Sequence, residues 1–335
     1  MTGLADDDAS RNRTLIAKFT RRDLMLYALS VGYNDDDLSQ CYESHKDFGE
    51  PLPTFLLALI FMAQPQGDRP FPTGIRRFPP SFMRHSDGLG PLPRIFLRET
   101  YFDEADSSQD FPTVLHMSQS LSVHGPIILR EPTLDDPDPP TTMEFNVAIE
   151  QVKPRKIGTF VKTRTVYTQD GTLVATSEMV AMILGIDPSH VVPLNDDSEL
   201  AASKETKPRS QIFRTSETKM LQFNVARNAA LLYRLNGDYN RIHVDGGSFF
   251  DRPLLHGLCS LGMVARAVLQ NTKNKASDLK TIVCFFTKPV FIGDRLELWI
   301  SRNDDWIDFC VTSQNKGEAK VKGRLLLVQK ALSSL

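Results

Sequence analysis

Residues 231–269 read LLYRLNGDYNRIHVDGGSFFDRPLLHGLCSLGMVARAVL, a polar loop between two apolar segments. The first segment is helical in pattern and breaks at Asn236-Gly237, because this dipeptide favours a turn. A second, nearly all-apolar helix is expected from Pro253 onward. The loop between them carries two titratable side chains, Asp238 and His243. A carboxylate and an imidazole on a loop held between two helices predict an acid/base site.

The composition excludes several classes of protein. The 335 residues are 41% hydrophobic and 24% charged, which is typical of a globular chain of one large or two ordinary domains. A net charge of −2 disfavours a nucleic-acid partner. The cysteines lack CxxC spacing, so neither a zinc site nor a redox motif is predicted. No apolar run reaches roughly 18 residues, so no membrane insertion is expected.

The two ends of the chain suggest its location. Residues 1–17 contain three consecutive acids and no apolar core, so we expect a flexible tail rather than a secretory signal. Residues 333–335, Ser-Ser-Leu, resemble the Ser-Lys-Leu peroxisomal address without its basic residue. A weak address and a chance ending both remain open, so the expected location is intracellular, either peroxisomal or cytoplasmic.

The pattern along the chain predicts the same order of elements twice. In the first half we expect a helix at 21–31, a helix buried all round at 55–63, and an irregular arm at 64–100. In the second half we expect a helix at 218–235 and another at 254–269. Runs rich in β-branched residues predict antiparallel strands at 113–123, 143–152, 158–167 and 173–184, and again at 279–286, 295–302, 306–314 and 318–328.

Two short matches indicate an internal duplication. Residues 26–34, LYALSVGYN, align without gaps on residues 232–240, LYRLNGDYN, and residues 51–54, PLPT, match residues 253–256, PLLH. We therefore expect an N-terminal repeat at 18–187, a polar linker at 188–211 and a C-terminal repeat at 212–335. Each repeat is predicted to be a central helix wrapped by an antiparallel sheet, in the α+β class.

The same alignment shows that the two repeats differ in their candidate catalytic residues. Asp238 aligns with Gly32 and His243 with Asp37, while His256-Gly257 aligns with Thr54-Phe55. Only the C-terminal repeat therefore keeps an acid/base pair and the glycine, and we expect one site per chain.

The loop residues allow more than one interpretation. Asp238 and His243 suit general acid/base work, with Asn240 between them to orient a water or a carbonyl. From spacing alone, the favoured alternative is that Asp238 caps a turn and His243 is a hydrogen-bonded loop histidine. His243, Asp245 and His256 could together supply three metal ligands, but nothing in their spacing requires this and no metal is expected.

The start of the second helix, His256-Gly257, could form an oxyanion hole. The first backbone N–H groups of a helix have no partner within it, and they lie at the positive end of the helix dipole. A glycine there allows close approach of a thioester carbonyl. The alternative is a helix start that needs a small residue for packing.

The segment 233–257 resembles the hydratase 2 signature, Tyr-x-Leu-Ser-Gly-Asp-x-Asn-Pro-Leu-His. This signature belongs to the MaoC-like (R)-specific 2-enoyl-CoA hydratase family, which includes the hydratase part of peroxisomal multifunctional enzyme type 2. The resemblance continues through 286–290, and in the first half through 26–32, 52–55 and the segment around His116 and Gln119. The chain departs from the signature at Asn236, Arg241 and Gly246, where the family has a small hydroxyl residue and two prolines.

The resemblance implies a double hot-dog fold with the acyl chain lodged between the repeats. It implies Asp238 and His243 as the acid/base pair, Asn240 as their partner in placing water, and the Gly257 amide as donor to the thioester oxygen. His256 and Lys288 are expected to bind substrate. The implied reaction is reversible syn hydration of trans-2-enoyl-CoA to (3R)-3-hydroxyacyl-CoA, without a cofactor. The expected partner is acyl-CoA or a carrier-bound acyl thioester, and the expected state is a monomer or a homodimer.

Three other functions compete with this hydratase. The first is a MaoC-like dehydratase that acts on a 3-hydroxyacyl or polyketide-type thioester in biosynthesis. The second is a hot-dog thioesterase, which usually has an Asp or Glu on its central helix; neither 55–63 nor 254–269 contains one. The third is a non-catalytic acyl-thioester-binding protein, which would have no need of Asp238, Asn240 and His243.

Overall fold

The computed structural model describes residues 12–65, 113–185, 191, 193–195, 218–246, 250–314 and 317–328. Most of the predicted arm at 64–100 lies outside these residues, as do most of the linker and the Ser-Ser-Leu end. The boundaries of the linker therefore stay predictions. Leu194, within the linker, forms an antiparallel bridge with Val152, so this part of the chain is attached to the N-terminal repeat.

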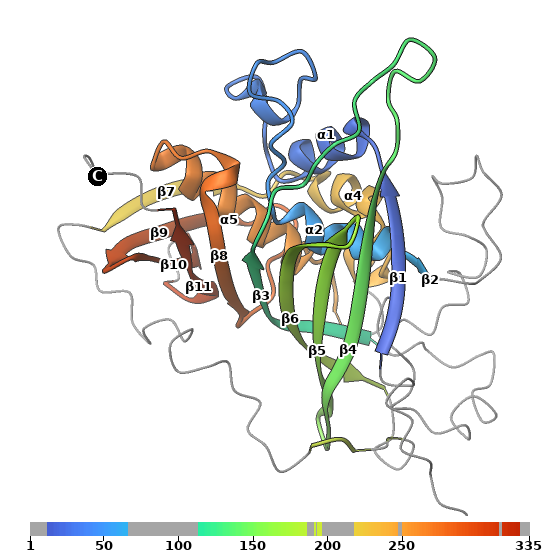
Figure 1. Cartoon of the computed structure of the whole chain (residues 1–335). Coiled ribbons are helices and arrows are strands. Elements are labelled where there is room, and N and C mark those ends of the chain that lie inside the picture. Colours follow the sequence, from blue (N-terminus) through green and yellow to red (C-terminus); the bar gives the residue numbers. More distant parts are fainter. Residues whose placement is uncertain are drawn as a thin grey trace, which may run out of the picture.

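Each repeat contains helices followed by a run of strands (Figure 1). The N-terminal repeat comprises β1 (Asn12–Phe19), α1 (Arg21–Ser30), α2 (Phe55–Leu59), the 3-10 turn η3 (Ile60–Met62), β2 (Gln64–Pro65), β3 (Thr113–Val123), β4 (Thr141–Arg155), β5 (Gly158–Gln169) and β6 (Thr172–Leu184). The C-terminal repeat comprises β7 (Lys219–Asn224), α4 (Ala229–Tyr233), the 3-10 turns η8 (Arg234–Asn236) and η9 (Arg241–His243), α5 (Gly257–Asn271), β8 (Leu279–Phe286), β9 (Arg295–Asn303), β10 (Trp306–Ser313) and β11 (Ala319–Leu327).

The strands of the described part of the chain form one continuous sheet. Their order is β2-β1-β4-β5-β6-β3-β8-β11-β10-β9-β7, and every pairing is antiparallel. If β2 is left out, each repeat contributes five strands, and the two repeats have the same strand order. Counted from the outer edge of the sheet inward, this order is the first, third, fourth, fifth and second strand of the repeat. The two halves meet where β3 pairs with β8, from Ser118 opposite Phe285 to Ser122 opposite Thr281.

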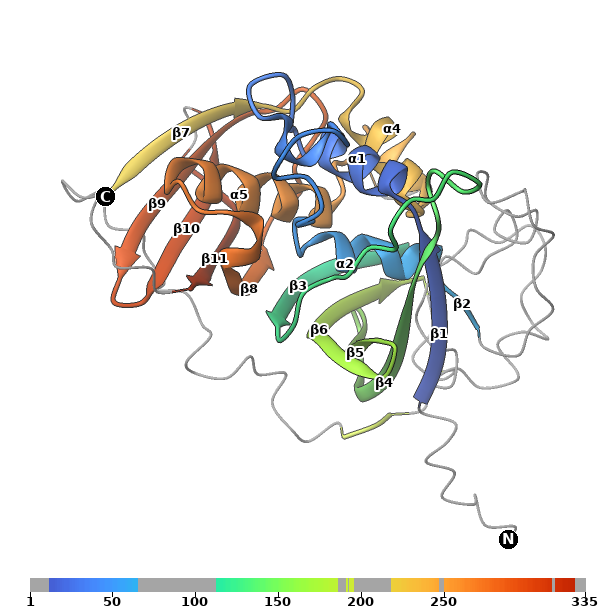
Figure 2. The same ribbon diagram turned by 45° about the horizontal axis from the view of Figure 1, so that its top comes forward.

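The sheet curves around one helix in each half (Figure 2). α2 lies against the strands of the N-terminal repeat and α5 against those of the C-terminal repeat, while α1 and α4 lie side by side between them (Figures 1 and 2). All five residues of α2 are buried, and α5 has ten buried residues. The predicted α+β class and double hot-dog arrangement are confirmed.

Equivalent residues of the two repeats contact one another. Asn236 Nδ2 donates a hydrogen bond to Ser30 Oγ at 3.1 Å, and these residues occupy the same position in the internal alignment. The rings of Tyr27 and Tyr233, also equivalent, lie 6.1 Å apart. A residue meets its own equivalent only near a twofold axis, so an approximate twofold axis relates the repeats and passes close to these pairs.

Two predictions were wrong in the same place of each repeat. Strand β1 occupies residues predicted as flexible tail, and strand β7 occupies the start of the helix predicted at 218–235. In β1, the buried side chains of Leu15, Ala17 and Phe19 alternate with more exposed ones. Such a short period-two pattern between charged residues is a weak signal, and pairing with β4 is what stabilises it.

Two predicted helices are shorter than expected. The helix predicted at 254–269 begins only at Gly257, because Leu254 bridges to Phe291 and Leu255 donates its N–H to Val290. The run at 55–63 is an α-helix for five residues and then tightens into η3. The side chains of η3 are only partly buried, so the prediction of burial all round holds for α2 but not for η3.

Gly262 lets α5 approach α1 closely. A Cβ on Gly262 would lie 2.5 Å from Val31 Cγ1 and 2.8 Å from the Tyr27 hydroxyl. We expect Gly262→Ala to lower the free energy of unfolding by about 1–2 kcal/mol, since overpacking outweighs a gain in helix propensity of about 1 kcal/mol. Urea denaturation would measure this, and adding Val31→Ala should recover part of the loss. A Gly262→Ala protein as stable as the parent would contradict the close packing.

Candidate active site

The loop after α4 is supported by the other repeat. Gly237 has a φ of +110°, a left-handed conformation that glycine adopts without strain. A Cβ at this position would lie 3.0 Å from the backbone carbon of Phe61 and 3.1 Å from the side chain of Met62, both in η3. Asn236, just before it, is buried and bonded to Ser30. Contacts with the N-terminal repeat therefore set the direction in which the chain enters the loop at Asp238.

Asp238 and His243 face one another at the end of this loop. His243 Nε2 lies 4.0 Å from Asp238 Oδ2, and both side chains are largely buried. His243 Nδ1 lies 3.0 Å from the carbonyl oxygen of Leu254. Because a carbonyl can only accept, Nδ1 carries the proton, and the Nε2 of the neutral ring presents its lone pair on the side of Asp238.

Asp238 also forms a turn, as the alternative, structural interpretation of this residue predicted. Its Oδ1 accepts a hydrogen bond from Asn240 N at 3.3 Å, and Asn240 Oδ1 in turn accepts from Ile242 N at 3.3 Å, where it caps η9. One carboxylate oxygen thus closes the turn while the other faces His243. The two interpretations of Asp238 are compatible, since each uses a different oxygen.

His256 stacks directly on His243. The ring centroids lie 3.5 Å apart with an angle of 23° between the planes, and the Tyr233 ring, tilted by 46°, lies 4.8 Å from that of His256. His256 Nε2 lies 3.2 Å from the backbone oxygen of Asp238, so Nε2 carries the proton. Its Nδ1 is buried and has no hydrogen-bond partner among the described residues. The stack fixes His243 from one side and the backbone of Asp238 from another.

Burial keeps both imidazoles neutral near pH 7. It lowers the pKa of His243, an effect that the nearby carboxylate of Asp238 opposes. It lowers the pKa of His256 well below the usual value, and the neighbouring His243 lowers it further. A neutral His243 can accept a proton at Nε2, which general-base work requires.

Gly257 begins α5 beside these side chains. A Cβ on Gly257 would lie 3.1 Å from the ring of Phe286, so a larger residue would displace that ring. Phe286 also packs against His116 of β3, with ring centroids 4.8 Å apart. As the first residue of the helix, Gly257 presents a backbone N–H without a partner inside the helix.

The three residues predicted as possible metal ligands do not all come together in the structure. Asp238, rather than Asp245, joins His243 and His256, with one ligand atom from each inside a 4.8 Å group. Asp245 instead pairs with Arg241 at 2.8 Å. Two stacked imidazoles direct their nitrogen lone pairs side by side rather than at a common point, so this cluster does not suit a metal ion.

Lys288, predicted to bind substrate, forms an ion pair with Glu318, and both side chains are about half exposed. Its side chain therefore differs from the buried imidazoles in its exposure to solvent. Three further contacts of the site were not foreseen: the Leu254 carbonyl, the Tyr233 ring and the packing of Phe286. Tyr233 had a signal in the sequence, as the tyrosine repeated at Tyr27, and Phe286 begins the stretch 286–290 that resembles the family.

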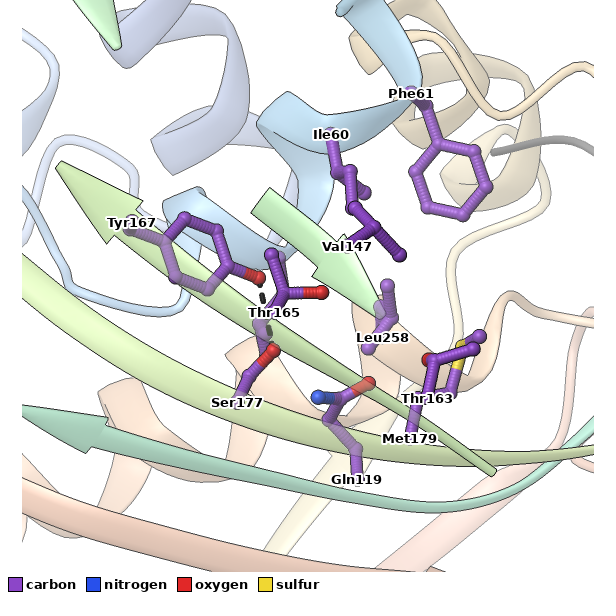
Figure 3. A pocket seen from close by; sticks show the side chains of 11 residues that line it. Ile60, Phe61, Gln119, Val147, Thr163, Thr165, Tyr167, Ser177, Met179 and Leu258 are labelled. Atoms are coloured by element: carbon purple, nitrogen blue, oxygen red, sulfur yellow. Dashed lines mark hydrogen bonds between the residues drawn. The ribbon is translucent and has the colours of Figure 1, made fainter. Parts of the chain in front are cut away.

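A small pocket, partly open to solvent, lies inside the N-terminal repeat (Figure 3). Its walls come from α2 and η3 on one side and from β3, β4, β5 and β6 on the other. Leu258 of α5 also lines it and directly follows Gly257. The pocket is thus contiguous with the start of α5.

Comparison with known families agrees with the two-repeat architecture. Residues 204–322 match the MaoC like domain, and residues 18–87 match the MFE-2 hydratase 2 N-terminal domain. The predicted resemblance to MaoC-like and hydratase 2 proteins is thereby confirmed at the level of these two domains.

Individual relatives and structures are similar as well. Peroxisomal multifunctional enzyme type 2 of Drosophila melanogaster is 26% identical over 323 residues, which cover 91% of this chain and 45% of that enzyme. Enoyl-CoA hydratase 2, peroxisomal, of Arabidopsis thaliana is 44% identical over 78 residues, covering 21% and 25%. The matched residues cover less than half the length of each of these two relatives. The crystal structure of a MaoC-like dehydratase from Phytophthora capsici matches with a TM-score of 0.67 at 23% identity, covering 98% of this chain and 100% of that one, which shows the fold.

The lowered pKa of His116, which is partly buried in β3, predicts that acid destabilises the fold. Burial lowers the pKa of His116 to about 4, from 6.5, so below pH 6.5 the unfolded chain binds more protons than the folded one. Stability should therefore be full above pH 6.5 and fall as the pH drops toward 4. His116 alone should account for up to roughly 2 kcal/mol between pH 7 and pH 5.

Urea denaturation of the parent, His116→Gln and the exposed-site control His124→Gln at both pH values would test this. His116→Gln should lose less stability on acidification than the parent, and His124→Gln should behave like the parent. Equal pH dependence in all three proteins would refute the assignment to His116.

Proposed function

We propose that this chain, which joins an MFE-2 hydratase 2 N-terminal domain to a MaoC-like domain, adds water reversibly to trans-2-enoyl-CoA to give (3R)-3-hydroxyacyl-CoA. One arrangement carries the proposal. Asp238 Oδ2 and His243 Nε2 lie 4.0 Å apart, and both are acceptors when His243 is neutral. A water molecule can donate one proton to each, and two such bonds would hold it beside the substrate.

The reaction follows from these groups. The backbone N–H of Gly257 donates to the thioester oxygen and stabilises the enolate that develops there. As the water oxygen forms its bond to Cβ, the Asp238/His243 pair takes one of its protons, and the pair delivers a proton to Cα. The enoyl double bond is lost, the elements of one water are added, and no group is oxidised or reduced. The same steps in reverse are a dehydration.

Asn240 and His256 serve as positioning residues in this proposal. Asn240 closes the turn that fixes Asp238, and the His256 ring supports His243 by stacking. The cavity of the N-terminal repeat would take the acyl chain, because Leu258 lines it next to Gly257. Lys288 and its partner Glu318 are exposed, so a role for Lys288 would be at the surface, toward the carrier end of the thioester.

The dehydration direction is the second candidate. The Phytophthora structure is named a MaoC-like dehydratase, and a 3-hydroxyacyl or polyketide-type thioester would be the substrate in that case. The same residues would act in both directions, so the physiological direction depends on the supply of substrate. A peroxisomal location is proposed with the first direction, since the Drosophila and Arabidopsis relatives are named as peroxisomal. In the described part of the chain, no helix is both long and apolar enough to cross a membrane.

The purified protein should hydrate trans-2-enoyl-CoA thioesters, followed as loss of the enoyl-thioester absorbance, with chiral analysis of the product. Asp238→Asn and His243→Gln should each lower kcat by at least about 100-fold, because each removes one member of the acid/base pair. Asp245→Asn is the matched control: a carboxylate of the same loop, exposed and paired with Arg241. It should stay within about twofold of the parent, since surface pairs contribute little.

Two results would count against the proposal. Turnover that persists in both Asp238→Asn and His243→Gln would refute the assignment of these residues to the active site. If no enoyl thioester of any chain length is hydrated, and no 3-hydroxyacyl thioester is dehydrated, the third candidate, a non-catalytic acyl-thioester-binding protein, would replace the enzyme.

A further inference from the structure

Lys320, in β11, is a buried lysine with only 7% of its surface exposed. Its ammonium group contacts the loop 287–294, which connects β8 to β9. Lys320 Nζ donates a hydrogen bond to the carbonyl oxygen of Pro289 at 2.8 Å and lies 3.8 Å from Asp294 Oδ2. Removing a charged pair from water costs free energy, and apolar residues in its place are often no less stable. Stability alone therefore gives little reason for a lysine at this position.

The backbone of Lys320 holds the beginning of the same loop. Its carbonyl oxygen accepts a hydrogen bond from Thr287 N at 2.9 Å and another from Lys288 N at 3.2 Å. The ammonium group contacts the middle and the end of the loop, as described above. Lys320 thus holds the loop 287–294 along its whole length.

Asp294 passes this attachment on to Phe291. Its Oδ2 accepts a hydrogen bond from Phe291 N at 3.0 Å, and its Oδ1 lies 3.7 Å from Arg252 Nη2. The guanidinium group of Arg252 lies 4.0 Å from the centroid of the Phe291 ring, and Lys320 Nζ lies 5.8 Å from it. Phe291 is therefore fixed through both its backbone and its ring.

The loop in turn pairs with the segment that leads into α5. Phe291 forms an antiparallel bridge with Leu254, and Leu255 N donates to the Val290 carbonyl oxygen at 2.8 Å. Leu254 is the residue whose carbonyl oxygen lies 3.0 Å from His243 Nδ1. The bond made by one ring nitrogen decides which nitrogen of a neutral imidazole carries the proton. The position of the loop therefore decides whether His243 Nε2 remains an acceptor.

We propose that Lys320 is a positioning residue for the acid/base pair. Through the loop 287–294 it holds the Leu254 carbonyl oxygen against His243 Nδ1. It thereby keeps Nε2 free to accept a proton from water. The inference rests on the proposed function and adds a residue on which that function depends. Lys320 acts through the loop and touches none of the reacting atoms.

The first test replaces Lys320 by methionine, which keeps an unbranched side chain and removes the ammonium group. Because the loop is then held less firmly, kcat for hydration of trans-2-enoyl-CoA should fall by on the order of tenfold. Lys322→Met is the matched control, since Lys322 lies two residues along β11 and points to the same face of the sheet. It should stay within about twofold of the parent.

The second test reads the tautomer of His243 without any reaction. Proton–nitrogen correlation spectra of protein labelled with ¹⁵N-histidine distinguish the two neutral tautomers, and His243→Gln identifies the signals of His243. The parent and Lys322→Met should carry the proton on Nδ1, and Lys320→Met should show a larger share on Nε2. A loss of stability alone would change neither the tautomer nor kcat of the folded protein, so this measurement separates positioning from packing.

Asp294→Asn decides the question if Lys320→Met does not fold. It removes the negative charge beside Lys320, while the amide oxygen can still accept from Phe291 N. It should shift the tautomer and kcat in the same direction as Lys320→Met, but less strongly. A parent-like tautomer and kcat in every folded variant would overturn the proposal, and hydration by the parent would leave the reaction in place. A tautomer shift in a protein that hydrates no thioester would support the positioning and overturn only the proposed reaction.

Discussion

The pairing of β3 with β8 joins two similar halves into one molecule. Its backbone hydrogen bonds make the two sheets continuous and place the equivalent helices α1 and α4 side by side. Ser30 and Asn236 then meet across the approximate twofold axis, as do Tyr27 and Tyr233. Residues of both repeats therefore share one hydrophobic core, which extends from Leu15 to Leu325. Neither half has a complete core without the other.

The two repeats use one structural pair for different purposes. In the N-terminal repeat the Tyr27 hydroxyl lies 2.8 Å from Thr54 Oγ1. In the C-terminal repeat the equivalent pair is Tyr233 and His256, whose rings lie 4.8 Å apart at a tilt of 46°, and the Tyr233 hydroxyl has no partner among the described residues. Thr54 provides a hydrogen-bond partner for the Tyr27 hydroxyl. His256 provides none for the Tyr233 hydroxyl and instead stacks on His243. A stabilising contact in one repeat corresponds to a contact that serves the site in the other.

Much of the fold could be predicted because the informative patterns are local. The tyrosine, leucine and asparagine positions shared by 26–34 and 232–240 indicated the duplication, and β-branched runs between turn residues located eight strands. The first strand of each repeat, β1 and β7, escaped detection because its pattern is short and depends on pairing with β4 and β9. For the site, Asp238 and His243 could be nominated from their spacing on the loop. The Leu254 carbonyl and the stack of His243 on His256 could not, because they arise only when the start of α5 folds back against the loop.

The contact of Gly237 with η3 has consequences for the duplication of the repeat and for the separation of the two repeats. The chain turns into the loop of Asp238 against Phe61 and Met62, which belong to the repeat without an equivalent of Asp238 and His243. That repeat is thus a support for the loop as well as the container of the cavity. After a duplication, losing the chemistry of one copy is tolerable, but losing the copy itself is not. The C-terminal repeat cannot be excised as an independent module unless a second copy of a hot-dog repeat replaces the missing support.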